Sequence, residues 1–422
     1  MIKKFLSNLA ILPKMFYRVP FLVPYWNGEE FREIITAIFT GRLIRGESRE
    51  KFVEDFLNFI DLKYGFATNM GRSAIELTLR GLGLGAGDEI ILPTFCCRGV
   101  IIPVIKAGCT PVFADIGDDF NINPESVREY LTPKTRAVIV AHLSGKVAKI
   151  DEIKEIIKNR NIFLIEDACQ ITGGKHGGKF LGTLGDVGIF SFGMGKNMMA
   201  TAGGFLATNS QDLYYRILNI KIGNEKPGEV LKRAIHRVVK FRFRKYSMPF
   251  FIIKDVITSK FVSESPSKYE LLRISNLDAA LLRLQLGKLE EIIEKRKRNA
   301  KILHRELSQI EEVVIPEFDE DNIFTKFIII FKKGTKPLKI GLCQEVRSFT
   351  RYLKKYSIET EETYTPLHLR KEFKQYYRAI LPKSEDLYWR ATTIPVQPNL
   401  KEKDILYISN VIKRYFANKY YE

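Results

Sequence analysis

Two neighbouring stretches, IFLIEDACQ at 162–170 and GIFSFGMGKN at 188–197, decide how this chain folds. Each begins as a short apolar run typical of a buried strand. The first ends in the carboxylates of Glu166 and Asp167, and the second ends in a glycine-bracketed turn that carries Lys196. Glycines let a ligand approach the backbone, and a lysine held away from water can react as a neutral amine and form a Schiff base. Both strand ends are therefore candidate ligand sites.

Each stretch also has an ordinary structural explanation. The carboxylates of Glu166 and Asp167 could cap a following helix, and on that segment alone capping is the favoured interpretation. A single lysine in a turn is more often a surface residue. The chemical hypothesis therefore depends on what surrounds the two stretches.

The surrounding sequence alternates short apolar runs with amphipathic stretches. The expected strands lie at 65–69, 89–93, 111–115, 137–142, 162–167, 188–192 and 204–208, and helical periodicity appears at 74–84 and 150–159. This alternation predicts an α/β domain with a mostly parallel sheet that has helices on both faces. Ligands bind beyond the carboxyl ends of the strands in such sheets.

A third strand end adds a candidate anion site. Gly71, Arg72 and Ser73 follow the first expected strand and begin a helix, where backbone N–H groups and the helix dipole attract anions. Taken alone, this turn could be an ordinary helix N-terminus. Together the three strand ends offer what pyridoxal 5'-phosphate requires, namely a phosphate cradle, a carboxylate for the ring nitrogen and a lysine for the aldehyde.

Composition limits the other function classes. The 422 residues include five cysteines, with no CxxC pair, and we therefore expect a reducing, cytoplasmic setting, no disulfide framework and no metal site. The net charge of +18 is diffuse and accompanies no nucleic-acid-binding motif, which makes nucleic acid an unfavoured partner. One stretch is richer in positive charge, because ten Lys or Arg lie between 226 and 260. An amphipathic surface helix or covering hairpin, a contact with an anionic membrane and a phosphate-rich substrate site all stay open for it.

Three regions complete the predicted organisation. Residues 1–28 are an N-terminal extension whose apolar run at 5–12 is too short to span a bilayer, which takes about 18 apolar residues. This leaves open a peripheral contact at the inner membrane face. Residues 29–290 form a large cofactor-binding domain with a basic insertion at about 226–268. One helix is expected at 276–301, and residues 291–422 form a small α+β domain with helices near 341–355 and 403–417.

These motifs resemble the DegT/DnrJ/EryC1/StrS family of sugar aminotransferases, which have the aspartate-aminotransferase (pyridoxal-phosphate fold type I) architecture. The resemblance extends from about residue 41 to the C-terminus. GRSAI at 71–75 resembles the family's Gly-Thr-Ala-Ala-Leu, and EDACQ at 166–170 resembles Glu-Asp-Ala-Ala-Gln. Further similar stretches are GDEIILPTF at 87–95, AGCTPVFAD at 107–115, Lys196 with Gly203 and Gly204, YTPLH at 364–368 and Ser384 with Glu385.

The resemblance implies roles for individual residues. Lys196 would bind the cofactor covalently and move a proton, and Asp167 would pair with the pyridinium nitrogen. Gln170 would contact the ring hydroxyl side, while Ser191 and the Gly71–Ser73 turn would hold the phosphate. The sugar would face Phe95, Tyr364, His368 and Glu385. The implied reaction moves an amino group from glutamate to a keto group of a nucleotide-activated sugar, in a homodimer with the active site near the interface.

The chain departs from the family at two positions and by the insertion at about 226–268, which lies just before the interface loop and would change the substrate mouth. The aromatic residue that stacks on the cofactor ring falls at Cys97, and an asparagine donated across the dimer to the phosphate falls at Leu271. Arg72 could compensate for the second loss. A family relative with histidine in place of the lysine is a dehydratase, so Lys196 favours transamination. Dehydration or action on an amino acid, and a non-catalytic regulatory protein bound to membrane or nucleic acid, remain the alternatives.

Overall fold

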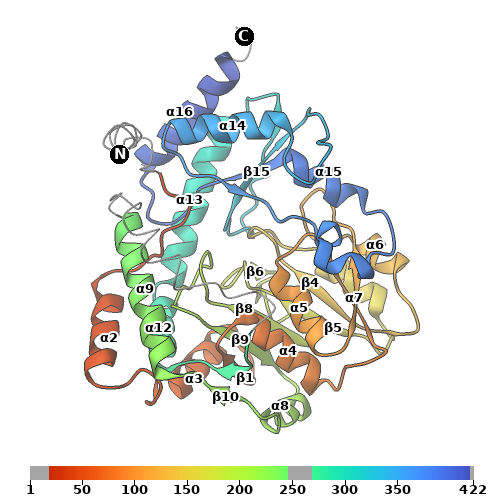
Figure 1. Ribbon diagram of the computed structural model, residues 1–422, viewed down its shortest axis with the longest axis vertical. Helices are drawn as coiled ribbons and strands as arrows, with labels where there is room; N and C mark the ends of the chain where they lie inside the picture. Colours follow the sequence, from red (N-terminus) through yellow and green to blue (C-terminus); the bar gives the residue numbers. More distant parts are fainter. Residues whose placement is uncertain (1–18, 246–268, 419–422) are drawn as a thin grey trace, which may run out of the picture.

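A nine-stranded sheet forms the centre of the larger part of the computed structural model, which describes residues 19–245 and 269–418 (Figure 1). The strand order is β10-β11-β1-β9-β8-β5-β4-β2-β3. The strand bounds, in chain order, are β1 Tyr64–Thr68, β2 Glu89–Pro93, β3 Thr110–Ala114, β4 Thr135–Ala141, β5 Phe163–Asp167, β8 Val187–Ser191, β9 Gly204–Thr208, β10 Gly223–Asn224 and β11 Leu272–Arg273.

The sheet is mixed but mostly parallel, as the sequence predicts. Strands β3, β2, β4, β5 and β8 pair in parallel, whereas β9 runs antiparallel to both β8 and β1. Because two reversals cancel, β1 points the same way as β8. The carboxyl ends of β1, β2, β4, β5 and β8 therefore meet at one edge of the sheet, where a ligand site is expected.

Helices cover both faces of this sheet. Alternate side chains of one strand divide between the faces, since Ile90 and Leu92 pack in one apolar cluster and Ile91 in another. The first face carries α4 (Gly71–Gly81), α5 (Arg98–Lys106) and α8 (Gln211–Leu218). The second carries α2 (Gly28–Phe39), α3 (Ser48–Ile60), α6 (Pro124–Glu129), α7 (Ile150–Ile157) and α12 (Asn276–Leu286). The predicted α/β layering is confirmed.

The prediction of a single helix at 276–301 is wrong in one respect. The structure has two helices there, α12 (Asn276–Leu286) and α13 (Leu289–Leu307). Where the first helix ends, the N–H of Lys288 donates to the carbonyl of Gln285, three residues back instead of four, at 3.1 Å. Lys288, at the break, forms ion pairs with Glu29 and Glu30 of α2 at 2.8 Å each. These tertiary contacts redirect the chain where the apolar periodicity continues without interruption.

A smaller four-stranded antiparallel sheet follows in the order β12-β13-β15-β14. Its strands are β12 Val313–Val314, β13 Phe327–Phe331, β14 Glu361–Glu362 and β15 Ala391–Ile394, and the helices α14 Gln344–Lys355, α15 Pro382–Arg390 and α16 Glu402–Asn418 lie with it. The short hairpin of β6 Lys175–His176 and β7 Lys179–Phe180 and the 3-10 helices η3 Leu367–Leu369 and η4 Lys371–Tyr376 complete the described elements. The predicted domain boundary at 290 falls inside α13 and stays a prediction.

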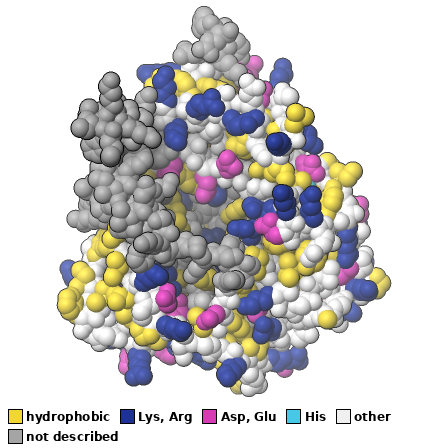
Figure 2. Space-filling model, in the orientation of Figure 1, with side chains coloured by type: hydrophobic (Ala, Val, Ile, Leu, Met, Phe, Trp, Pro, Cys, Tyr) yellow, Lys and Arg dark blue, Asp and Glu magenta, His cyan; other side chains and the backbone are white. Residues whose placement is uncertain are grey.

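The basic insertion begins as a helix rather than a hairpin. Helix α9 covers Pro227–Lys245 and lies beside α2 and α12 in Figure 1. The rest of the insertion, 246–268, and the N-terminal apolar run at 5–12 lie outside the described residues. Within residues 19–245 and 269–418, no helix is long and apolar enough to cross a bilayer. Lys and Arg side chains are spread over the face shown in Figure 2, interleaved with acidic ones, in line with a diffuse charge.

Candidate active site

A cavity of about 1360 Å³ opens at the carboxyl edge of the large sheet. Seven residues predicted from the sequence line it: Gly71, Arg72, Cys97, Asp167, Gln170, Ser191 and Lys196. They come from the last residues of β5 and β8 or from the loops and helix starts that follow β1, β2, β5 and β8. The topology thus brings together groups that lie up to 125 positions apart in the chain (196 minus 71).

The loop that carries Lys196 connects β8 to β9 and is fixed on both sides. Gly195 adopts a left-handed conformation with φ +84°, which a side chain would strain. After the lysine, Asn197 donates to the carbonyl of Thr172 at 3.0 Å, and the indole N–H of Trp26 donates to the carbonyl of Met199 at 2.8 Å. These bonds hold the backbone that positions Lys196 at the cavity.

Asp167 ends β5 and is 7% exposed. Its Oδ1 accepts the backbone N–H of Cys169 at 3.0 Å, and its carbonyl accepts the N–H of His142 at 3.1 Å. Gln170 lies one turn further on, where its Oε1 accepts the N–H of Ser144 at 3.1 Å. Both side chains are thus held in fixed orientations at the cavity wall.

Glu166 does not cap a helix, so that interpretation is wrong. No helix follows β5 directly in the described chain, because residues 168–173 turn back beneath the cavity. The fully buried carboxylate instead accepts the N–H groups of Gly182, Leu184 and Gly185 at 2.6, 2.7 and 3.1 Å, and it pairs with His142 at 2.9 Å. Glu166 holds a loop together, while its neighbour Asp167 lines the cavity.

The predicted anion turn stands at the start of α4. Its N-cap residue, Met70, provides no side-chain hydrogen bond to the first turn. A Cβ built on Gly71 would lie 2.8 Å from the Cβ of Ser191, so only glycine permits this close approach of the two segments. Ser73 differs from the prediction, because its hydroxyl is buried and donates to Oδ1 of Asn69 at 2.7 Å, and the residue does not line the cavity. Ser73 thus stabilises the turn through its hydrogen bond to Asn69.

The four residues predicted to face a sugar lie behind the cavity wall and are not part of its lining. Tyr364 accepts a hydrogen bond from Nε2 of Gln170 at 3.2 Å, and its ring lies edge-on to Phe95 at 6.1 Å. His368 is within 2.6 Å of the Thr94 hydroxyl through Nδ1 and within 3.3 Å of Glu385 through Nε2. The structure therefore places these side chains between the two sheets. Their contact with a substrate stays a prediction.

The position of the family's stacking aromatic is occupied by a thiol. Cys97 is exposed and is the N-cap of α5, with its Sγ accepting the N–H of Gly99 at 3.3 Å. Cys169 lines the same cavity, and burial together with the nearby Asp167 raises its pKa well above that of a free thiol. Cys169 was not among the site residues predicted from the sequence, although its position two residues after Asp167 in EDACQ could have indicated it.

A second group of cavity residues lies on α9 and just before it, in the basic stretch for which the sequence left a phosphate-rich substrate site open. Lys226, Lys232, His236 and Arg237 line the cavity, together with Arg233. Lys232 and His236, and likewise Arg233 and Arg237, are four residues apart, which places these four on one side of α9, while Lys226 directly precedes the helix. The basic stretch was noticed in the sequence, but its orientation depends on tertiary contacts of Arg233 with Glu225 and Asp278, which are 8 and 45 positions away.

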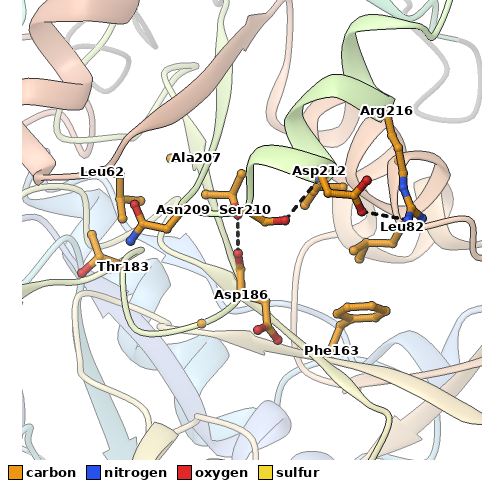
Figure 3. Close-up of a pocket in the computed structure, with 14 residues that line it drawn as sticks. Leu62, Leu82, Phe163, Thr183, Asp186, Ala207, Asn209, Ser210, Asp212 and Arg216 are labelled. Atoms are coloured by element: carbon orange, nitrogen blue, oxygen red, sulfur yellow. Dashed lines mark hydrogen bonds and ion pairs between the residues drawn. The ribbon is translucent and has the colours of Figure 1, made fainter.

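A smaller pocket of about 350 Å³ lies at the opposite edge of the sheet and contains no predicted site residue (Figure 3). Asp186 accepts the N–H of Leu164 at 2.7 Å, and its carbonyl accepts the hydroxyl of Thr208 at 2.8 Å. Arg216 pairs with Asp212 of the same helix at 2.7 Å. Because its polar groups bond to one another, this pocket offers no comparable set of residues for binding a cofactor.

Comparison with known proteins gives consistent matches over nearly the whole chain. A sequence model of the DegT/DnrJ/EryC1/StrS aminotransferase family matches residues 24–413. GDP-perosamine synthase of Escherichia coli O157:H7 is 26% identical over 404 residues, which cover 95% of this chain and 99% of that protein. The spore coat polysaccharide biosynthesis protein SpsC of Bacillus subtilis is 27% identical over 391 residues, covering 92% and 94%.

Among solved structures, an aminotransferase from Psychrobacter cryohalolentis has a TM-score of 0.77 at 23% identity, covering 94% of this chain and 99% of its own. An E. coli GDP-4-keto-6-deoxy-D-mannose-3-dehydratase with bound hydrated pyridoxal phosphate has a TM-score of 0.76 at 21% identity, covering 94% and 100%. The predicted fold-type I architecture is therefore confirmed. At these identities the structural likeness extends to the fold and not to the reaction.

Proposed function

The chain belongs to the DegT/DnrJ/EryC1/StrS aminotransferase family, and we propose that it uses pyridoxal 5'-phosphate to transfer an amino group from glutamate to a keto group of a nucleotide-activated sugar. The names of its relatives support this proposal, since one is a GDP-perosamine synthase and another serves spore coat polysaccharide biosynthesis. The product would enter a glycan, polysaccharide or lipopolysaccharide.

One observation carries the proposal: Lys196, Asp167 and the Gly71 turn line a single cavity at three strand ends. These residues fit pyridoxal phosphate. Gly71 leaves open the space beside Ser191 that a Cβ would fill, and the first turn of α4 directs backbone N–H groups toward an anion placed there. When bound, the cofactor supplies an electron sink that stabilises negative charge on the substrate carbon.

The protein side of the chemistry follows from these positions. Lys196 would hold the cofactor's aldehyde carbon and, once released by the amino donor, would move a proton at its Nζ. Asp167 would accept the hydrogen bond of the protonated ring nitrogen, and its hydrogen bond from Cys169 orients the carboxylate for that task. Gln170, bonded to Tyr364, would contact the ring hydroxyl side.

The alternative of dehydration is supported by structures of GDP-4-keto-6-deoxymannose-3-dehydratase among the similar folds, including the E. coli enzyme. Lys196 favours transamination, because the amine can both hold the aldehyde and move the proton. We further propose a homodimer in the cytoplasm. A peripheral membrane contact is tested below by binding to lipid vesicles.

The test is the first half-reaction alone. Glutamate added to the cofactor-loaded protein is expected to convert the absorbance of the lysine-bound cofactor into that of pyridoxamine phosphate, with 2-oxoglutarate released. A Lys196→Ala protein should fail to do so, and borohydride reduction followed by peptide mapping should place the phosphopyridoxyl group on Lys196. If neither glutamate nor glutamine changes the spectrum, or if the label maps elsewhere, the proposal fails.

A further inference from the structure

One wall of the active-site cavity is formed by α9 (Pro227–Lys245), whose role the proposed reaction leaves unassigned. Two cations of this wall, Lys232 and Arg237, are five positions apart. His236 lies between them, and Lys226 precedes the helix. The acidic residues of this wall are Glu229 of the same helix and Glu225 before it, against the four cations Lys226, Lys232, Arg233 and Arg237. The wall is therefore positively charged on balance.

A buried ionic cluster fixes this wall in place. Arg233 donates to Glu225 through two nitrogens at 2.6 and 3.0 Å, and to Oδ2 of Asp278 at 2.7 Å. Asp278 is fully buried, and its Oδ1 accepts the backbone N–H groups of Thr201 and Ala202 at 2.9 and 3.0 Å. The cluster thus joins α9 to the loop that carries Lys196, and the charge of Arg233 is used within the protein.

Arg237 is anchored to the same loop. Its Nε donates to the carbonyl of Thr201 at 3.3 Å, and its side chain is part-buried. Thr201 also bonds to Nε of Arg233 at 3.0 Å. Thr201 belongs to the same β8–β9 loop as Lys196, so this anchoring holds the Arg237 side chain at the wall of the cavity that Lys196 also lines. Lys232, five residues earlier on α9, is exposed and lines the same cavity.

The size of the cavity leaves room for a second ligand beside the cofactor. Its volume of about 1360 Å³ exceeds the roughly 300–1,000 Å³ of a typical single-ligand site. The cofactor phosphate already has its own cradle at Gly71 and Ser191. An additional cationic wall in the same cavity therefore suits a second anionic group, and a guanidinium with a neighbouring ammonium is suited to phosphate oxygens.

We propose that the cavity-facing side of α9 binds the diphosphate of the nucleotide-activated sugar, with Lys232 and Arg237 as its principal contacts. This inference rests on the proposed function, since it assumes a nucleotide-linked substrate. It assigns the basic stretch to the substrate, because its described cations line a concave site instead of forming a flat outer surface.

Calorimetry on the full-length, cofactor-loaded protein tests the inference, with inorganic pyrophosphate and GDP as probes. The double variant Lys232→Gln/Arg237→Gln should bind both probes about tenfold more weakly, which corresponds to about 1.4 kcal/mol. Lys232→Gln alone changes an exposed side chain and should weaken binding by a smaller factor. The control Lys63→Gln/Lys221→Gln removes two charges from exposed positions outside the cavity and should bind like the wild type.

Three results would overturn the inference. The first is unchanged affinity for pyrophosphate and GDP in both α9 variants. The second is a loss of affinity for pyridoxal phosphate in these variants while their affinity for pyrophosphate and GDP is unchanged, which would assign these cations to the cofactor. The third is unchanged probe binding with reduced binding to vesicles of phosphatidylcholine and phosphatidylglycerol, which would assign α9 to a membrane. The glutamate half-reaction needs no nucleotide, so its failure in the wild type would overturn the proposed function separately.

Discussion

Adjacent carboxylates at the end of β5 have opposite tasks, and Glu166 shows why a buried charge needs several partners. It accepts three backbone N–H groups and pairs with His142. Nδ1 of that histidine accepts the N–H of Ala148 at 3.0 Å, so its Nε2 carries the proton donated to Glu166. The carboxylate thereby organises the loop 182–185, of which Thr183 and Gly185 line the smaller pocket at the opposite edge of the sheet.

Glu166→Ala is expected to destabilise the protein by about 3–5 kcal/mol, because several buried donors lose their common acceptor. Urea unfolding followed by circular dichroism measures the change. Glu152→Ala, which removes an exposed carboxylate paired with Lys149, should change the unfolding free energy by less than about 1 kcal/mol. Equal midpoints for Glu166→Ala and the wild type would contradict the role assigned to Glu166.

His368 gives a pH dependence whose sign follows from its burial. Desolvation lowers its pKa below the usual 6.5, although Glu385 acts in the opposite direction. The unfolded chain therefore binds a proton more readily, and stability should fall as pH decreases from about 6.5 toward the lower folded pKa. His368→Gln should lose less stability between pH 7 and pH 5 than the wild type. The prediction fails if the difference in unfolding free energy between the two proteins does not change over that range.

For single residues, the sequence was most informative where a chemically reactive side chain stands at or just after the end of a predicted strand. Lys196 and Asp167 each follow a strand that the alternation of apolar runs predicts. Ser73 was placed in the phosphate turn, but its hydroxyl bonds to Asn69. Which way one hydroxyl points within a turn depends on neighbours that the local pattern does not reveal.

Helix α9 shows how one ionic cluster can position an entire element. Arg233 is the link, since Glu225 precedes the helix and Asp278 lies on α12. Asp278 also bonds to Ser275, the N-cap of α12, so the start of that helix shares the cluster. Trp26 packs against Phe241 near the other end of α9, with ring centroids 4.9 Å apart.

Arg233→Ala should cost about 3–5 kcal/mol, because it leaves two buried carboxylates without their cation. It should also weaken pyrophosphate binding, since α9 would lose its attachment to the Lys196 loop. The matched control is Arg216→Ala on α8, whose exposed pair with Asp212 should contribute less than about 1 kcal/mol. Urea unfolding and calorimetry on both variants decide the matter, and an equal loss of stability in the two would refute the positioning role of Arg233.

Elements with a clear period were predicted well, and their ends less so. The strands at 89–93 and 204–208 agree with β2 and β9 to the residue, because turn residues flank short buried runs. The helix expected at 276–301 instead breaks at Gly287, where ion pairs from Lys288 to α2 compete with continued periodicity. Such long-range contacts are invisible to a local pattern.

Over the whole molecule, polar contacts join the large sheet to the segments that pack with the small sheet. Asp115, after β3, accepts the N–H groups of Lys383 and Ser384 at 2.9 Å each, and Glu89 pairs with Arg378 at 2.8 Å. The N-terminal segment also connects them, since Val19 pairs with Ile358 and Trp26 bonds to Met199. Because these contacts connect the two parts of the molecule, ligand binding at the cavity should stabilise the whole chain against unfolding.

Pyridoxal phosphate should accordingly raise the melting temperature of the entire chain. A ligand present at 100 times its Kd stabilises the folded state by about 2.7 kcal/mol. The rise should be larger for the wild type than for Lys196→Ala, which keeps the phosphate turn and Asp167 but cannot form the covalent bond. Differential scanning calorimetry with and without the cofactor measures both shifts, and inorganic phosphate at the same concentration controls for a simple anion effect. Equal shifts in the two proteins would show that Lys196 contributes nothing to holding the cofactor, whereas a shift confined to one of two separate transitions would show that the two sheets do not unfold together.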